Sequence, residues 1–120
     1  MQRGDTYLAS FPFGDAPGMK LRPVLLLTGP IGTGKEVIVA YISSVTPESL
    51  LSTDVTLDPA EPDHASAGLK MRSVLRLHKI ATIHVSVLQR RLGEIPPSAK
   101  DQVRSILLDM LSLGSTDKQA

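Results

Sequence analysis

The chain has no cysteine and no tryptophan, and aromatic residues form only 3% of its 120 positions. The lack of cysteine excludes disulfide frameworks and thiolate zinc sites, and it fits a reducing cytoplasm. No apolar run approaches the roughly 20 residues that span a bilayer, and the N-terminal stretch lacks the apolar core of a signal peptide. We therefore expect a cytoplasmic protein that makes no contact with a membrane.

The chain also lacks a strong net charge, at +1, but its charges are unevenly distributed. Acidic residues crowd positions 54–63, whereas none occurs from His64 through Gly93. That second segment, here called the basic stretch, contains Lys70, Arg72, Arg76, Lys79, Arg90 and Arg91. The asymmetry predicts one anion-facing surface on a nearly neutral body. The alternative is a solvated face without a partner.

The composition is that of an ordinary globular protein, with 42% apolar and 21% charged residues, and the length is typical of one domain. We expect a single domain over residues 1–114 and a flexible tail over 115–120. Residues 58–68 are expected to form a polar loop, and Gly93 a β-bulge. Alternating or short apolar segments predict β-strands at residues 5–11, 24–28, 37–42, 53–57, 73–83 and 89–95. The fifth of these is expected to be long and bent.

A helix is expected after the prolines at positions 96 and 97, which end the last strand pattern. Ser98 suits the N-cap, with Asp101 three residues later in a capping-box arrangement, and Gly114 suits the position just past the helix end. Apolar residues at helical spacing between them give the helix one buried face. Short strands followed by one amphipathic helix predict a mainly β fold, namely a small antiparallel barrel capped by the helix.

One segment is close to a nucleotide-binding loop. Residues 29–35 read Gly-Pro-Ile-Gly-Thr-Gly-Lys and match most of the pattern G-x-x-x-x-G-K-[ST]. Glu36, however, stands where the magnesium-binding hydroxyl belongs. A phosphate-binding loop must also open a helix, whereas the residues that follow are rich in β-branched side chains. We therefore predict a flexible hairpin loop at this position and not a nucleotide site.

The most informative arrangement joins an arginine to a pair of hydroxyls. Arg22-Pro23 precedes one apolar run, and a second apolar run ends in Ser43-Ser44. If the loop between the runs reverses direction, the strands lie side by side and Arg22 comes close to Ser43. A guanidinium binds two phosphate oxygens at once, so this pairing predicts a phosphodiester site. The alternatives are an arginine that bonds loop carbonyls and a serine that satisfies a neighbouring backbone group.

These residues occur in an order that resembles the MazF/PemK/Kid family of bacterial toxin endoribonucleases. The opening Arg3-Gly4-Asp5 looks like the start of that family, and Lys20-Leu21-Arg22-Pro23-Val24-Leu25 is similar to its arginine–proline strand. The second apolar run, with its terminal hydroxyl pair, looks like the family's third strand. The resemblance extends from about Arg3 to Leu113.

The resemblance implies a small Src-homology-like antiparallel barrel of the MazF/PemK/CcdB plasmid-maintenance-toxin type, paired into a homodimer. It implies a sequence-specific endoribonuclease that cleaves single-stranded RNA without a metal or other cofactor and is silenced by a cognate antitoxin. Arg22, Ser43 and Arg76 match catalytic or RNA-contacting positions of the family, although many relatives carry threonine in place of the serine. Two residues after Arg76, where several relatives place an aspartate, this chain has His78.

Metal-free cleavage can use the 2′-hydroxyl of the substrate as the nucleophile, which leaves a 2′,3′-cyclic phosphate and a 5′-hydroxyl. Arg22 would then stabilise the phosphorane. His78 is a candidate general acid or base, because imidazole ionises near neutral pH, although it is equally a candidate surface histidine. Contacts with RNA, including base stacking on the phenylalanine, are expected from Phe13, Lys20, Ser44 and Lys79.

Two other functions remain open on the residues alone. A CcdB-like toxin on the same barrel would bind a protein such as gyrase and cut nothing; the Arg22-Pro23 segment and the basic stretch argue against it. A P-loop nucleotide-binding protein is the third possibility, weakened by Glu36. Incubation with single-stranded RNA and EDTA separates the three.

Overall fold

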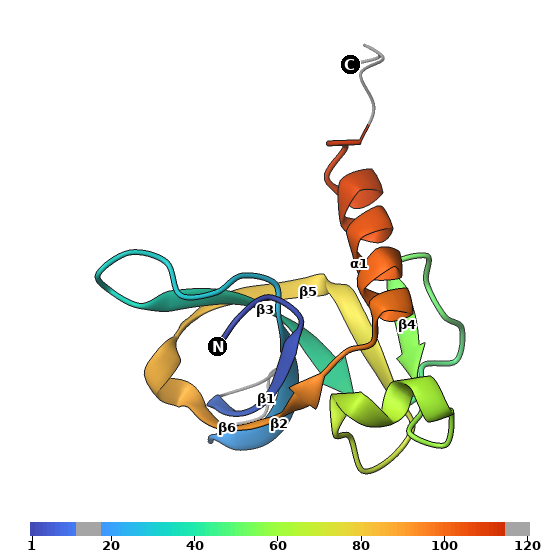
Figure 1. The fold of residues 1–120 in the computed structure, drawn as a ribbon, viewed down its shortest axis with the longest axis horizontal. Helices are drawn as coiled ribbons and strands as arrows, with labels where there is room; N and C mark the ends of the chain where they lie inside the picture. Colours follow the sequence, from blue (N-terminus) through green and yellow to red (C-terminus); the bar gives the residue numbers. More distant parts are fainter. Residues whose placement is uncertain (12–17, 115–120) are drawn as a thin grey trace.

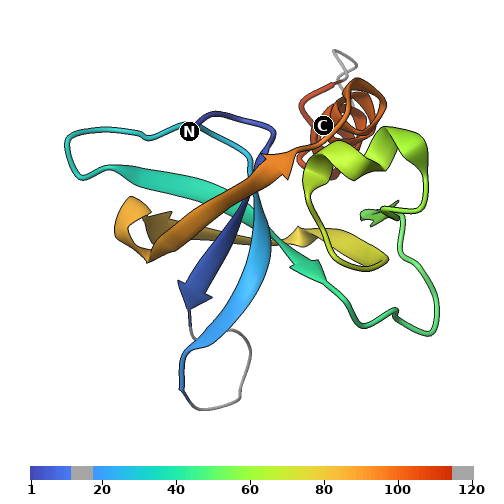
Figure 2. The ribbon, with the colours of Figure 1, turned by 60° about the horizontal axis from the view of Figure 1, so that its bottom comes forward.

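The computed structural model describes residues 1–11 and 18–114, which form one antiparallel sheet followed by a helix. The sheet order is β4-β5-β3-β2-β1-β6. Figures 1 and 2 show the sheet curling on itself, with α1 rising beside β4 and β5. The expected mainly β fold with a C-terminal helix is confirmed. The elements are β1 (Asp5–Phe11), β2 (Lys20–Leu26), β3 (Glu36–Ser43), β4 (Asp54–Leu57), η1 (Pro62–Ala67), β5 (Ser73–His84), η2 (Val85–Val87), β6 (Leu88–Glu94) and α1 (Pro97–Met110).

Each predicted strand is present, and the long bent strand is β5. Its pairing with β3 jumps from Tyr41↔Arg76 to Ala40↔Ile80, so residues 77–79 have no partner on β3. We call these three residues the β5 bulge. β6 also shifts register against β1, from Thr6↔Gly93 to the next pair, so the bulge predicted near Gly93 is confirmed. Bulges of this kind increase local bend and twist, and they allow a small sheet to curl.

The core has two parts, one on each face of the sheet. Leu25, Ala40 and Leu75 pack with Ala99 and Val103 of α1, so the apolar face predicted for the helix covers one side of the sheet. The second cluster lies on the other face and contains Ala9, Val24, Leu26, Val37, Val39 and Ile83. Alternating side chains of β2 therefore serve different clusters, as the period of a strand requires.

The predicted helix caps are wrong at both ends. Pro96 is the N-cap residue and α1 begins at Pro97, with no side-chain cap hydrogen bond. Proline suits the first helical position because its missing N–H would have no intrahelical partner there, so the Ser98–Asp101 capping box does not form. At the other end Ser112, with φ of 56°, takes the left-handed position expected of Gly114. Ser112 N donates a hydrogen bond to Asp109 O, and Leu113 N donates one to Leu108 O, as in a Schellman motif.

The loop predicted for residues 58–68 is wrong in part, because it contains the 3₁₀ helix η1. This helix packs against β6 and β1. Thr6 Oγ1 donates a buried hydrogen bond of 2.7 Å to Ala67 O, and Ser66 Oγ donates one of 2.8 Å to Glu94 O. A polar composition gave no sign of η1, because a side-chain donor on β1 and a backbone acceptor on β6 hold it in place.

Candidate functional site

Arg22 and Ser43 lie on the two adjacent strands β2 and β3. These strands pair Val24 with Tyr41 and Leu25 with Ala40. Continuing the same register by two residues brings Arg22 opposite Ser43. Residues directly opposite in an antiparallel pair project to the same face of the sheet. The prediction that the two strands are neighbours is confirmed, and the convergence of Arg22 and Ser43 on one phosphate stays a prediction.

The two side chains differ in how they are held. Arg22 is exposed, and its backbone pairs with Ala9 of β1 on the side away from β3. Ser43 is half-buried, and its hydroxyl accepts a 3.1 Å hydrogen bond from Val45 N while donating a 3.3 Å one to Val45 O. The local role considered for Ser43 is thus present. The 3.3 Å bond from Ser43 Oγ to Val45 O is the longer and weaker of the two, so a stronger acceptor can replace Val45 O.

Arg76 lies on the same face of the sheet, one strand further along. It is paired across β3 with Tyr41 and across β4 with Asp54. Arg76 Nε donates a 2.6 Å hydrogen bond to Asp54 Oδ1, and the Asp54 side chain has no exposed area. Burial raises the pKa of the neighbouring Tyr41, so its hydroxyl is neutral across the physiological range. The register therefore assembles Arg22, Ser43, Tyr41 and Arg76 on one face.

His78 is in the β5 bulge, where the ladder to β3 is interrupted. The ring is exposed, and its Nδ1 lies 3.0 Å from Thr53 Oγ1. The backbone joins the same two segments, because Leu77 N donates a 3.0 Å hydrogen bond to Thr53 O. Simple strand alternation predicted that His78 and Arg76 share a face, but the bulge breaks the alternation on which that prediction depended.

The other predicted contact residues surround this face unevenly. Lys20 is half-buried at the start of β2, two residues before Arg22 and therefore on the same face. Ser44 is exposed just beyond β3, and Lys79 is exposed in the β5 bulge. Phe13, with its loop, lies outside the described residues.

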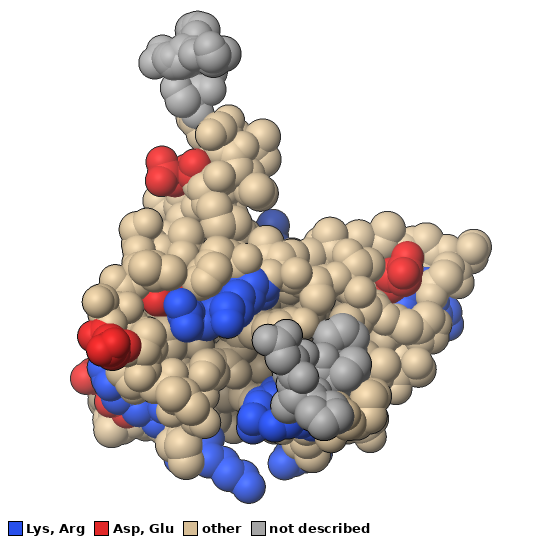
Figure 3. Space-filling model, turned by 180° about the vertical axis from the view of Figure 1, so that it is seen from behind, with Lys and Arg blue, Asp and Glu red and all other residues tan. Residues whose placement is uncertain are grey.

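The basic stretch is less positive than its sequence indicated. Two of its cations are in ion pairs, Arg76 with Asp54 and Arg91 with Asp5. Lys70, Arg72, Lys79 and Arg90 are exposed. Figure 3 shows Lys and Arg side chains gathered on the lower part of one face of the molecule, below the helix. Lysine and arginine side chains gathered on one face favour the approach of a polyanion.

The loop that came close to a nucleotide-binding pattern is a hairpin loop between β2 and β3. Ile31 and Glu36 form a two-way bridge, with Ile31 N bonding to Glu36 O at 2.8 Å. Residues 36–43 continue as β3 and not as a helix. Without a helix N-terminus the loop has no dipole to hold a phosphate, so the prediction of a hairpin is confirmed.

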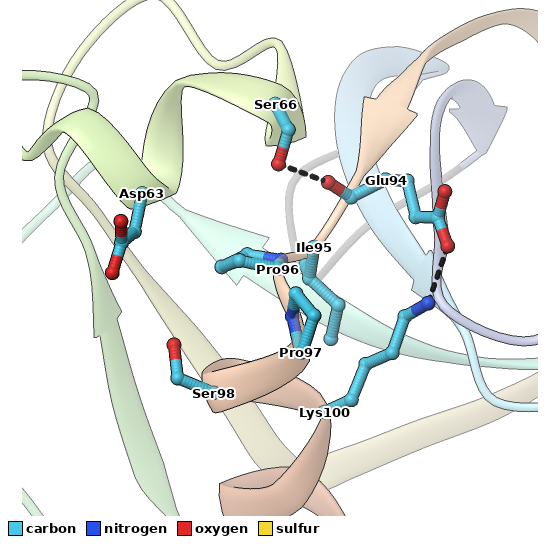
Figure 4. A pocket seen from close by; sticks show the side chains of 8 residues that line it. All are labelled: Asp63, Ser66, Glu94, Ile95, Pro96, Pro97, Ser98 and Lys100. Atoms are coloured by element: carbon cyan, nitrogen blue, oxygen red, sulfur yellow. Dashed lines mark hydrogen bonds and ion pairs between the residues drawn. The ribbon is translucent and has the colours of Figure 1, made fainter.

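Two hollows in the described part of the chain lie away from this face. The first, of about 580 Å³, lies between η1, the end of β6 and the start of α1, and Figure 4 shows Glu94 there, bound to Ser66 and Lys100. The second, of about 430 Å³, is an apolar groove along α1 floored by Leu26 and Leu107. Neither is lined by Arg22 or Ser43, so neither hollow is the predicted phosphodiester site.

Thr53 and Asp54 are the site residues that the sequence did not identify. Asp54 was one of a crowded acidic group, and nothing in the spacing links it to Arg76, 22 residues later. Only the pairing of β4 with β5 brings them together. Within residues 1–11 and 18–114, no group of three His, Asp or Glu side chains gathers as a metal site would require, and no helix there is long and apolar enough to cross a membrane.

Comparison with known proteins gives a consistent result. A sequence model of the family described as "PemK-like, MazF-like toxin of type II toxin-antitoxin system" matches residues 2–111. No curated protein matches the chain. Among solved structures, a Mycobacterium tuberculosis toxin named MazF-mt6 is 25% identical with a TM-score of 0.68, covering 92% of this chain and 99% of that chain.

Two mycobacterial structures share the fold at lower identity. An endoribonuclease in complex with its cognate antitoxin is 18% identical with a TM-score of 0.67, covering 96% of this chain and 98% of that one. Another endoribonuclease is 19% identical with a TM-score of 0.67, covering 96% and 94%. The architecture is thus shared over nearly the whole length of these chains.

Proposed function

This chain belongs to the PemK-like, MazF-like toxins of type II toxin–antitoxin systems, and on that premise we propose that it is a sequence-specific endoribonuclease that cleaves single-stranded RNA without a metal ion. The observation that carries the proposal is the pairing of β2 with β3, whose register, continued two residues beyond Val24↔Tyr41, would bring Arg22 opposite Ser43. A permanent cation and a hydroxyl fixed on adjacent strands suit one phosphodiester group. The solved endoribonucleases with the same fold support the reaction class.

The reaction moves two protons and exchanges one P–O bond for another. The 2′-oxygen of the RNA loses its proton to a base and attacks the adjacent phosphorus. The bond from phosphorus to the 5′-oxygen then breaks, and that oxygen takes a proton from an acid. The products are a 2′,3′-cyclic phosphate and a 5′-hydroxyl. The protein needs only to stabilise the extra negative charge of the phosphorane and to supply the base and the acid.

Arg22 supplies the charge. Its guanidinium is always protonated and presents several N–H donors to the equatorial phosphate oxygens. Ser43 gives up its 3.3 Å bond to Val45 O and donates that proton to a phosphate oxygen, while Val45 N continues to hold its Oγ. Arg76 adds a second cation on the same face, since its Nε is bound to Asp54 and its terminal nitrogens extend beyond.

His78 is the proposed acid–base group. Its Nδ1 faces Thr53, so Nε2 is the nitrogen that exchanges a proton with the RNA. Lys20, Lys79 and Ser44 contact the RNA backbone around this centre, and Phe13 stacks on a base. Base-specific contacts come from the loops at residues 15–20 and 29–36, because recognition of single-stranded RNA uses adaptable loops.

The proposed partners are a cognate antitoxin protein and a second copy of the chain, and the proposed location is the cytoplasm. The solved mycobacterial complex supports the antitoxin. Light scattering of the purified protein tests the homodimer, which has twice the 12.9 kDa mass of one chain. Adding an acidic peptide from the cognate antitoxin should suppress RNA cleavage.

The decisive experiment incubates the purified protein with end-labelled single-stranded RNA in EDTA and maps the fragment ends. Cleavage that leaves 2′,3′-cyclic phosphates supports the proposal. No cleavage of any of a set of RNAs covering all short motifs overturns it and favours the CcdB-like alternative, a toxin that binds a protein such as gyrase. Cleavage that requires a divalent metal keeps the nuclease but rejects the mechanism.

A further inference from the structure

The β5 bulge removes the pairing with β3 that would otherwise support His78, the proposed acid–base group. Residues 77–79 have no partner on β3, because the pairing jumps from Tyr41↔Arg76 to Ala40↔Ile80. An exposed histidine in such a segment is not aimed by the sheet. Holding an acid–base group within reach of its proton requires support from elsewhere.

That support comes from the turn that leads into the edge strand β4. Thr53 Oγ1 lies 3.0 Å from His78 Nδ1, and Thr53 O accepts the 3.0 Å hydrogen bond of Leu77 N. The threonine thus contacts the bulge through both its side chain and its backbone. With Nδ1 engaged, the opposite ring nitrogen, Nε2, points away from Thr53.

Asp54, the residue after Thr53, supports Arg76 in the same way. Asp54 Oδ1 accepts the 2.6 Å hydrogen bond of Arg76 Nε, and Asp54 Oδ2 accepts a 2.8 Å bond from Leu51 N. Both carboxylate oxygens are therefore occupied, and the side chain has no exposed area. The contact uses one of the five guanidinium N–H donors, so the terminal nitrogens keep donors for a further acceptor.

From these contacts we propose that Thr53 and Asp54 are positioning residues for RNA cleavage. Asp54 fixes the direction of the Arg76 fork toward the phosphate, and Thr53 fixes the ring of His78 with Nε2 toward the RNA. Thr53 thus supports the bulge where the ladder to β3 is interrupted, and Asp54 supports the arginine just before it. The proposal rests on the proposed endoribonuclease function and adds two residues to it.

Thr53→Val tests the histidine contact, because valine is near isosteric with the half-buried threonine. The variant should keep the thermal stability of the wild type and lose about 10- to 100-fold in single-turnover cleavage. Its pH–rate profile should change toward that of His78→Ala, and Thr53→Ser should restore both rate and profile. Thr82→Val, at an exposed position of β5, is the matched control and should cleave as the wild type does.

Asp54→Asn tests the arginine contact and keeps an acceptor of the same shape. We expect a lower cleavage rate at saturating RNA, measured well below the melting temperature. In an Arg76→Ala background the same change should have no further effect on cleavage, because two residues that act as a unit are not additive. A merely structural role would lower the melting temperature equally in both backgrounds and leave the rate of the folded protein unchanged.

The outcomes separate the two proposals. If the wild type cleaves no RNA, the proposed function fails, and with it this inference. If the wild type cleaves and Thr53→Val keeps its rate and pH profile, the positioning role of Thr53 is wrong while the nuclease stands. If Asp54→Asn does not fold, Thr53→Val and Thr53→Ser still decide the role of Thr53, and an unchanged cleavage rate in Arg76→Ala would reject that of Asp54.

Discussion

Arg91 of β6 donates a 3.1 Å hydrogen bond through Nη2 to Oδ1 of Asp5, whose side chain is only 2% exposed. The contact joins the first strand to the last. Burial alone would raise the pKa of Asp5, but the hydrogen bonds from Arg91 and Gln2 N and the nearby positive charges outweigh it, so the pKa lies below that of an ordinary aspartate.

This lowered pKa predicts a defined loss of stability in acid. A group whose folded pKa is below its unfolded pKa contributes stability that is fully present above the unfolded value, about 4. The contribution is lost as the pH falls through the lower folded value. Asp5→Asn should lower the melting temperature at pH 7 by on the order of 5 °C, and the difference from the wild type should shrink as the pH falls below about 4. A difference that is constant from pH 7 to pH 2 would contradict this account.

Gly93 lies where η1 approaches β6 so closely that an added methyl group would clash with the backbone. A Cβ at this position would lie 2.0 Å from Ser66 O and 2.9 Å from Ala67 C. These atoms belong to backbone that is itself anchored to β1 and β6, so they cannot give way cheaply. Gly93→Ala should destabilise the protein by about 3 kcal/mol in urea unfolding, at the upper end of overpacking effects.

Gly34 supplies the matched control for that substitution. It lies in the hairpin loop and a Cβ there would meet nothing within 4 Å. Gly34→Ala should therefore change the free energy of unfolding by less than about 0.5 kcal/mol. Equal effects of the two alanines would show that the close approach of η1 to β6 is not what requires Gly93.

The strands were predictable because their signal is local. Alternation and β-branched runs determine which segments of β1, β3 and β5 bury a face, and the bulge at Gly93 followed from a glycine inside such a pattern. The helix caps were not predictable in detail, because a serine before an apolar repeat indicates a cap whether or not a proline takes the first turn. η1 depends on hydrogen bonds to Glu94 O and from Thr6, far away in sequence, and left no local trace.

Of the proposed site, the neighbouring positions of β2 and β3 were predictable from the sequence. Arg22 and Ser43 share a face because one hairpin joins their strands. The contacts of Asp54 and Thr53 were not predictable, since they depend on which strand lies at the edge of β5 and on a bulge that breaks the alternation near His78. Registers between distant strands are set by the whole sheet and not by any one segment.

Arg22→Ala should reduce single-turnover RNA cleavage by on the order of 100-fold, because loss of one charge-stabilising donor typically costs about 3 kcal/mol in the barrier. The side chain is exposed, so the melting temperature should not change. Arg104→Ala on α1 is the control. This arginine is also exposed but lines the apolar groove along α1, so the variant should cleave normally. Full activity of Arg22→Ala would reject the assignment of the site.

Ser43→Ala should also lose cleavage, but it removes the acceptor for Val45 N as well as the hydroxyl. A second variant separates these effects. Ser43→Thr keeps the oxygen and its proton, so it should recover most of the cleavage rate of the wild type. If the threonine variant folds as stably as the wild type but cleaves no better than the alanine variant, the hydroxyl has no role beyond its turn.

His78→Ala should flatten the pH dependence of the cleavage rate, because the proposed acid–base group is gone. His84 offers a control on the same strand: it is exposed too, and its Nδ1 accepts a 3.0 Å hydrogen bond from Ser86 N. His84→Ala should keep the full pH profile. The rate must be measured under single-turnover conditions with saturating protein, so that the profile reports the chemical step and not RNA binding. If His78→Ala retains the limbs of the wild-type profile, another group moves the proton, and the charge stabilisation by Arg22 would then operate without histidine.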